Sequence, residues 1–298
     1  MPVPAQNQQY ENFIIRYKQN THGGFVYESD ETFQIVNDLF GILYVPMQEV
    51  PELELSSYSY SSIPRCYTYM DTGALSTSGV TRLHNHPYLK LQGKGTLVAV
   101  IDSGIDYLHP AFHNGVQSKI FSIWDQTLEG GADGRIPFGR EFGRQQIEQA
   151  LASENPWEIV PSSDTNGHGT RSAATAAGYR IEKDNFCGAA PEAEIVIVKL
   201  KQAKNYLRDF YLLPRDIDIF QEDDIMLAIS YVLFIAQEQQ MPLSICIGLG
   251  TSMGAHQGEG PLNEYINSIA AFTQNAVSVP AGNEGTARHH YLREFGPN

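Results

Sequence analysis

Residues 98–106 read VAVIDSGID, an apolar run that ends on the carboxylate of Asp102. Such a run, followed by turn-forming residues, predicts a strand that is buried on both faces, as in parallel sheets. In open α/β sheets, functional side chains gather at the carboxyl ends of these strands. Asp102 is therefore the first candidate site residue. The alternative is an aspartate that only caps a turn.

Strand and helix candidates alternate from Thr96 onward, which predicts a doubly wound α/β fold with a mainly parallel sheet. The expected strands are residues 96–101, 119–124, 194–199, 243–249 and 276–279. The expected helices are residues 169–178, 222–239 and 262–275. In the helix at 222–239 one face is apolar, and the acidic first turn complements the helix dipole. Residues 126–163 interrupt the alternation and are expected to form a long excursion.

The N-terminal part has a different pattern. Residues 13–17 and 42–45 are strand candidates, and residues 31–39 have apolar positions at helical spacing. The polar segment 56–64, rich in serine and tyrosine, is expected to be a linker, with an ordinary surface loop as the alternative. We therefore expect a small α+β unit with its linker at residues 1–65 and a larger domain at residues 66–298.

Composition excludes several classes of function. The net charge of −14 disfavours binding to nucleic acid. No apolar run approaches the ~20 residues that span a membrane, and the N-terminus lacks the pattern of a signal peptide. The three cysteines have no zinc-binding spacing, so we expect free thiols in a reducing compartment, with Cys246 buried in its strand. These features predict a cytoplasmic protein, with a removed leader as the alternative.

Two glycine-flanked polar residues follow Asp102 along the chain. His168 lies in NGHGT at residues 166–170, where the glycines let the backbone turn tightly and let a substrate approach. Asn283 lies in VSVPAGNEG at residues 277–285, where an apolar strand runs into a turn. An asparagine amide is an uncharged donor that suits an oxyanion. Each residue alone is also compatible with an ordinary loop.

Together, Asp102, His168 and Asn283 with their flanking motifs resemble the matching motifs of the subtilase family, in the same chain order. The resemblance covers residues 90–298 and implies a subtilisin-like serine endopeptidase. It implies that Asp102 orients His168, that His168 acts as general base, and that Asn283 helps to hold the oxyanion.

The resemblance also implies a substrate site. The family's cleft is lined by the strand that matches residues 245–250, so Gly248, Leu249 and Gly250 are expected to contact a polypeptide substrate. It implies no required cofactor. It allows a structural calcium ion, for which the sequence assigns no ligands.

Finer features resemble the clostridial subtilases, a group that includes spore-germination proteases. These features are residues 105–112, 123–126 and 134–141. In that group a short N-terminal prodomain is expected, and residues 1–65 match it in size and position. The resemblance therefore implies a zymogen that is cytoplasmic or spore-associated. Arg171 departs from the family, which more often has histidine there, and is expected to affect local packing.

The nucleophilic serine of the family is the missing element. It should follow the oxyanion asparagine in a Gly-Thr-Ser motif, but no serine follows Asn283. Ser252 lies in a Gly-Thr-Ser-Met sequence, yet it precedes Asn283 and directly follows the expected cleft strand. We therefore reject Ser252 as the nucleophile.

Three explanations of the missing serine are open. The chain is the N-terminal part of a longer protease, or a non-catalytic binding or signalling module, or one of two fragments that complete each other. The presence of Asp102, His168 and Asn283 favours the first. We then expect a C-terminally incomplete sheet, an inactive chain, and a C-terminal remainder as its partner.

Overall fold

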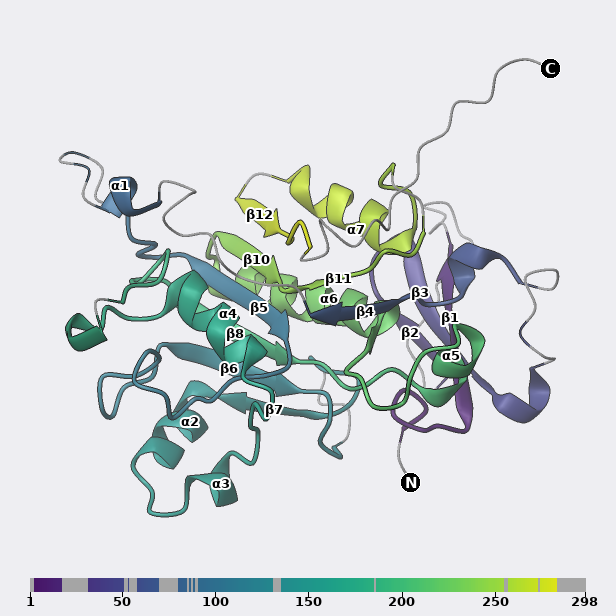
Figure 1. The fold of residues 1–298 in the computed structure, drawn as a ribbon, viewed down its shortest axis with the longest axis horizontal. Coiled ribbons are helices and arrows are strands. Elements are labelled where there is room, and N and C mark those ends of the chain that lie inside the picture. The colour runs from purple at the N-terminus through teal and green to yellow at the C-terminus, as the bar shows by residue number, and fades with distance from the viewer. Residues whose placement is uncertain are drawn as a thin grey trace.

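The computed structural model of this protein describes residues 3–17, 32–50, 53, 58–69, 80–84, 86, 88, 91–130, 135–184, 186–254, 257–272 and 274–282. Its centre is a six-stranded sheet with the strand order β12-β10-β5-β8-β6-β7 (Figure 1). The strands are Leu97–Asp102 (β5), Ile120–Asp125 (β6), Arg140–Gly143 (β7), Glu194–Lys199 (β8), Leu243–Ile247 (β10) and Asn275–Ser278 (β12). Neighbours are parallel except β6 and β7. The expected α/β fold with a mainly parallel sheet is confirmed.

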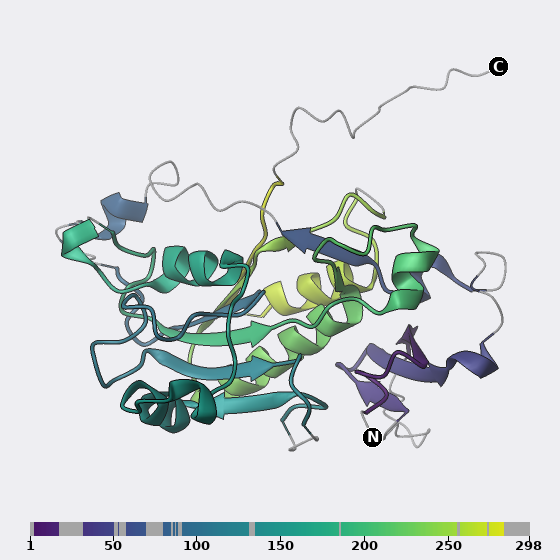
Figure 2. The same cartoon turned by 60° about the horizontal axis from the view of Figure 1, so that its bottom comes forward.

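Helices cover both faces of this sheet. Helix α4 (His168–Ala177) lies on one side of β5 and β8, and α6 (Glu222–Gln239) lies on the other (Figure 2). Helix α7 (Pro261–Ala270) belongs to the same core as α6. Along β5, Leu97, Ala99 and Ile101 pack in the core of α6, whereas Val98 and Val100 pack in the core of α4. The apolar run is unbroken because each side chain of β5 before Asp102 enters one of the two cores.

Shorter elements complete the chain. The excursion at 126–163 contains β7 and the helices α2 (Arg144–Leu151) and α3 (Pro156–Ile159). The remaining helices and 3-10 turns are η1 (Met47–Glu49), η2 (Tyr60–Ser62), α1 (Val80–His84), η3 (Glu182–Asp184) and α5 (Asn205–Phe210). Among the described residues, no helix is both long and apolar enough to cross a membrane.

The N-terminal unit is a three-stranded antiparallel sheet. Its strands are β1 (Tyr10–Arg16), β2 (Phe33–Ile35) and β3 (Phe40–Pro46), in the order β1-β3-β2. The helix expected at residues 31–39 is wrong, because β2 occupies its centre. The Asn37 side chain accepts the N–H groups of Leu39 and Phe40 and closes a turn between β2 and β3. Turn chemistry at Asn37 therefore outweighs the helical spacing of the apolar residues.

Helix α6 lies between the two sheets, which the sequence pattern did not predict. Met226 and Leu227, which lie outside the expected apolar face, belong to one core with Ile14 and Ile42 of the N-terminal sheet. Ser230 donates to the carbonyl of Val36 at the same contact. A helix that is apolar around most of its surface is buried on more than one side. The N-terminal unit therefore packs against α6 on the side that does not face the large sheet.

The acidic first turn of α6 is buried and does more than complement the helix dipole. Glu222, Asp223 and Asp224 are each at most 1% exposed. Asn12 of β1 donates to Asp223 at 2.5 Å and accepts a hydrogen bond from Lys204 at 2.6 Å. Burial lowers the pKa of Lys204 to about 7 and raises that of Asp224 to about 7. Asn12 thus joins the N-terminal unit to a buried cluster of charged groups.

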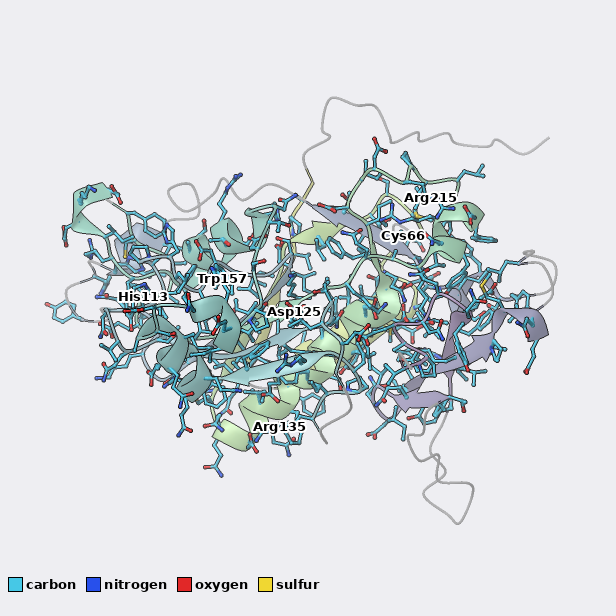
Figure 3. All side chains as sticks on the ribbon, turned by 90° about the horizontal axis from the view of Figure 1, so that it is seen from below. Cys66, His113, Asp125, Arg135, Trp157 and Arg215 are labelled. Carbon is cyan, nitrogen blue, oxygen red and sulfur yellow. The ribbon has the colours of Figure 1, made fainter. Side chains whose placement is uncertain are left out.

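The cysteines are free thiols, as expected. Cys66 is buried, and burial raises its pKa to about 12. It lies toward the end of the molecule that also carries Arg215, whereas His113 lies toward the opposite end (Figure 3). Cys246, which was expected to be buried, is only partly buried. It packs against the core that includes α4 and also lines an open groove beside β10.

We predict that Asn12→Ala weakens the attachment of the N-terminal unit. The change removes hydrogen bonds to two buried charged groups, so the free energy of unfolding should fall by about 2–3 kcal/mol. Unfolding in urea measures this change in the free energy of unfolding. The control is Asn114→Ala, because Asn114 is exposed and bonds within its own turn to Gln117. Equal stability of the two variants would contradict the prediction.

Candidate active site

The structure brings Asp102 and His168 into direct contact. Asp102 is the last residue of β5, and His168 is the first residue of α4. The Nδ1 atom of His168 lies 2.8 Å from Oδ1 and 3.0 Å from Oδ2 of Asp102. The N–H of Ser103 also donates to Asp102 Oδ1, at 2.7 Å. The carboxylate therefore accepts hydrogen bonds from the ring and from the backbone.

Burial differs between the two side chains. Asp102 is 1% exposed, whereas the side chain of His168 is 12% exposed. A buried carboxylate needs such partners, because an unpaired buried charge is strongly destabilising. The imidazole screens Asp102 from solvent and keeps one edge accessible. This arrangement can hold a histidine ring in one orientation and stabilise its protonated form.

Glycines allow the close approach of three segments around this pair. A Cβ atom on Gly248 would lie 2.2 Å from Asp102 Oδ2 and 3.2 Å from His168 Cε1. A Cβ atom on Gly169 would lie 2.2 Å from the carbonyl oxygen of Gly104. Gly169 therefore serves the packing of α4 against the segment after β5, and no substrate is needed to explain it.

The other two expected substrate contacts lie on β11 (Leu249–Gly250). The Leu249 side chain is 3% exposed and belongs to the core with α6. The backbone of β11 pairs antiparallel with β4 (Cys66–Tyr69), with Leu249 opposite Tyr69 and Gly250 opposite Thr68. On its other side β4 pairs with β9 (Phe220–Gln221). The strand expected to receive a peptide is thus already paired with a segment of this chain.

Of two further candidates, Ser252 and Asn283, the structure describes only Ser252. Ser252 is exposed and lies two residues beyond the end of β11. The chain then runs to Gly254, which packs against the guanidinium of Arg65. Asn283 lies outside the described residues. Its role as oxyanion donor therefore stays a prediction.

Neighbouring titratable groups have structural roles. Burial and the nearby Asp102 charge raise the pKa of the Cys246 thiol to about 11, so it is protonated at neutral pH and is a poor nucleophile. Asp125, a second buried carboxylate near the middle of the molecule (Figure 3), ends β6. It accepts a hydrogen bond from Ser162 at 2.7 Å and pairs with Lys199 at 3.3 Å. The negative charge of Asp125 is therefore balanced by Lys199 and by the hydrogen bond from Ser162, both within the fold.

The described part of the chain contains no candidate metal site. No group of three or more His, Cys, Asp or Glu residues there could hold a metal ion. The structural calcium ion allowed by the sequence therefore stays a prediction.

One polar residue near the pair was missed by sequence reasoning. Asp164 accepts hydrogen bonds from both Ser103 and Thr170. The available signal was an acidic residue just before the start of a helix whose cap position holds a glycine.

Comparisons with known proteins give similarity to one family of proteases. The family model described as the subtilase family matches residues 93–211. The intracellular serine protease of Paenibacillus polymyxa is 29% identical over 196 residues, covering 65% of this chain and 43% of that protein. Subtilisin-like protease SBT1.4 of Arabidopsis thaliana is 30% identical over 125 residues, covering 36% of this chain and 16% of that protein.

A solved structure is also similar. The Clostridium perfringens CspB protease matches with a TM-score of 0.58 and 30% sequence identity, covering 70% of this chain and 40% of that chain. This chain therefore spans less than half the length of each of these three proteins.

We predict that Gly248→Ala disrupts the contact between Asp102 and His168, because the added methyl group would overlap the carboxylate. Spectra of the protein labelled with ¹⁵N-histidine report which ring nitrogen carries the proton. They should show His168 protonated on Nδ1 in the parent and a mixture of tautomers in the variant. The control is Gly143→Ala, where the added Cβ has no atom within 4 Å. Identical His168 signals in all three proteins would contradict the prediction.

Proposed function

Because residues 93–211 match the model of the subtilase family, we propose that this protein is a serine endopeptidase that uses Asp102, His168 and a nucleophilic serine. The observation that carries the proposal is the contact of 2.8 Å between His168 Nδ1 and the buried carboxylate of Asp102. A pair of this kind at the carboxyl edge of a parallel sheet is suited to activating a hydroxyl group.

The proposed mechanism assigns one task to each group. With Nδ1 held by Asp102, Nε2 of His168 takes the proton of the serine hydroxyl as its oxygen attacks the peptide carbonyl carbon. Asn283 donates a hydrogen bond to the oxyanion of the tetrahedral intermediate. His168 then returns the proton to the leaving amine, and water hydrolyses the acyl-enzyme by the same route. Asp102 stabilises the imidazolium throughout.

We propose that the serine comes from sequence outside these 298 residues. Ser252 is unsuitable, because it precedes Asn283 in the chain and lies two residues before Gly254, which packs against Arg65. A groove of about 640 Å³ supports the proposal, since it lies along β10 and β12 on the face that carries α4. Its wall includes Val98, Ala176, Cys246 and Ala276. A further segment packed there would be buried against an apolar surface beside α4.

The alternative function is that of a non-catalytic binding or signalling module, which applies if the full-length protein has no nucleophilic serine. A subtilase fold without a nucleophile would act as a binding or signalling module. It would keep the geometry of Asp102 and His168 but hydrolyse nothing.

We further propose that residues 1–65 act as a prodomain that inhibits the site and assists folding. Strand β4, which follows this unit, supports inhibition because it occupies the pairing edge of β11. From Thr68 to Tyr69 the strand runs toward the position opposite Gly248, the glycine in contact with Asp102 and His168. A polypeptide substrate paired in the same way would reach the catalytic pair, so β4 and substrate would compete.

The remaining expectations are also proposals. A cytoplasmic location is supported by the relative named as an intracellular protease. A spore-associated role rests on the motifs that resemble clostridial subtilases. The proposed partners are a polypeptide substrate and the C-terminal remainder, with neither nucleic acid nor a membrane.

We predict that a fluorophosphonate probe labels the full-length protein at a serine beyond Asn283 and does not label residues 1–298 alone. Asp102→Asn should lower kcat by about 10⁴-fold with the fold retained, because His168 loses its correct tautomer. Peptide hydrolysis and mass spectrometry measure both effects. The control is Asp184→Asn, an exposed aspartate in η3. Labelling of Ser252 would refute the assignment, and a full-length protein that never labels would favour the binding module.

We predict that Thr68→Pro relieves inhibition by β4. Proline removes a backbone N–H from the middle strand of a three-stranded sheet, so β4 should leave the edge of β11 more readily. The initial rate of peptide hydrolysis by the full-length protein should rise about tenfold, the effect of roughly 1.4 kcal/mol of weakened pairing. Thr68→Val, which keeps the backbone donor, serves as the control. Equal initial rates would show that β4 does not compete with substrate.

A further inference from the structure

The helix that carries His168 lacks a side chain at its own N-cap. Gly167 holds this position with a φ of 81°, a left-handed conformation that suits glycine. The first N–H groups of a helix have no partners within the helix and need acceptors from elsewhere. In α4 two of them are accepted by distant side chains. Ser103 accepts from Gly169 at 2.9 Å, and Asp164 accepts from Thr170 at 2.8 Å.

Asp164 accepts four hydrogen bonds in total. Its Oδ2 accepts from the N–H and the hydroxyl of Thr170, at 2.8 and 2.6 Å. Its Oδ1 accepts from the N–H of Gly167 at 2.9 Å and from the hydroxyl of Ser103 at 2.8 Å. The carboxylate therefore bonds Gly167 before His168 and Thr170 after it, and it also bonds Ser103 in the segment after β5.

Ser103 extends this connection to the other member of the pair. Its backbone N–H donates to Asp102, while its hydroxyl donates to Asp164 and accepts from Gly169. Asp164, Ser103 and the first turn of α4 thus form a closed set of contacts around Asp102 and His168. The four hydrogen bonds of Asp164 involve neither the side chain of Asp102 nor that of His168, but its partners Ser103 and Gly167 directly adjoin these two residues in the chain.

The charge on Asp164 suits this position. Burial raises its pKa, but the hydrogen bonds from Thr170, Gly167 and Ser103 outweigh burial and hold the pKa below its ordinary value. Asp164 is therefore ionised at neutral pH and lies at the positive end of the α4 dipole. Ionised acceptors form the stronger class of hydrogen bonds.

We propose that Asp164 is a positioning residue that sets His168 against Asp102 by bonding the start of α4 to the segment after β5. Its role in hydrolysis rests on the proposed function, whereas its role in the geometry of the pair does not. A residue that only caps α4 would affect stability and leave the ring of His168 in place.

Residues 1–298 labelled with ¹⁵N-histidine test the positioning role without any need for catalysis. We expect Asp164→Ala to lose the single Nδ1-protonated signal of His168, while circular dichroism shows the fold retained. Asp164→Asn keeps one acceptor oxygen and should give an intermediate result, and it replaces Asp164→Ala if that variant does not fold. An unchanged His168 signal in the folded variants would overturn the proposal.

Glu148→Ala is the matched control. Glu148 is also half-buried and also accepts a backbone N–H, from Ser118, but it lies on α2. It should lower stability without changing the His168 signal. A change in His168 with this variant would show that the signal only follows general stability, and would also overturn the proposal.

In the full-length protein, Asp164→Ala should lower kcat 10- to 100-fold with little change in KM, because substrate contacts are untouched. A change in KM alone would contradict positioning. If His168 responds in the spectra but the full-length parent has no peptidase activity, the proposed function fails and the positioning role stands.

The pH dependence of stability provides an independent readout of the Asp164 charge. Because the folded-state pKa is lowered, the stabilisation is present above the unfolded value of about 4 and is lost as the pH falls through the folded-state pKa. The difference in unfolding free energy between the parent and Asp164→Asn should therefore shrink in acid. A difference that stays constant with pH would contradict an ionised Asp164.

Discussion

The burial of one carboxylate organises this fold. Asp102 ends the central strand of a sheet covered on both faces, and it is 1% exposed. A charge in such a place must be compensated by donors. The His168 ring and the Ser103 backbone supply them. The carboxylate constrains the start of α4 and the segment after β5, because these two segments supply its donors. It also constrains position 248, because a Cβ atom there would overlap the carboxylate.

A second set of buried charges attaches the N-terminal unit. The first turn of α6 places three carboxylates inside the protein, and Asn12 and Lys204 lie among them. The same helix packs its apolar sides against both sheets. Consequently the N-terminal unit is held by a large apolar contact and by a buried polar one. Strand β4 follows this unit and pairs with β11, which begins one residue after Gly248, the glycine beside Asp102 and His168.

The pattern of apolar residues along the chain predicted the main strands and the long helix of the large sheet well. Strand β8 and helix α6 begin and end at the expected residues, and β5 and β6 are displaced by only one residue. The strands have apolar runs, and α6 has an acidic first turn and a long apolar face. The helix expected at residues 31–39 failed because an asparagine turn, a local effect of one side chain, overrides weak helical spacing. Strands β4, β9 and β11 are two to four residues long and were not predicted as a sheet, because their pairing joins segments far apart in the chain.

The sequence by itself determined the fold class and the identity of Asp102 and His168 as candidates, because strand periodicity and strand-end motifs are local properties. Only the tertiary structure decided what surrounds them. It set the 2.8 Å contact of the pair, the four hydrogen bonds of Asp164, and the position of β4 against β11. Each of these contacts links different elements of the fold. Their geometry depends on how whole elements pack, which no local pattern of residues encodes.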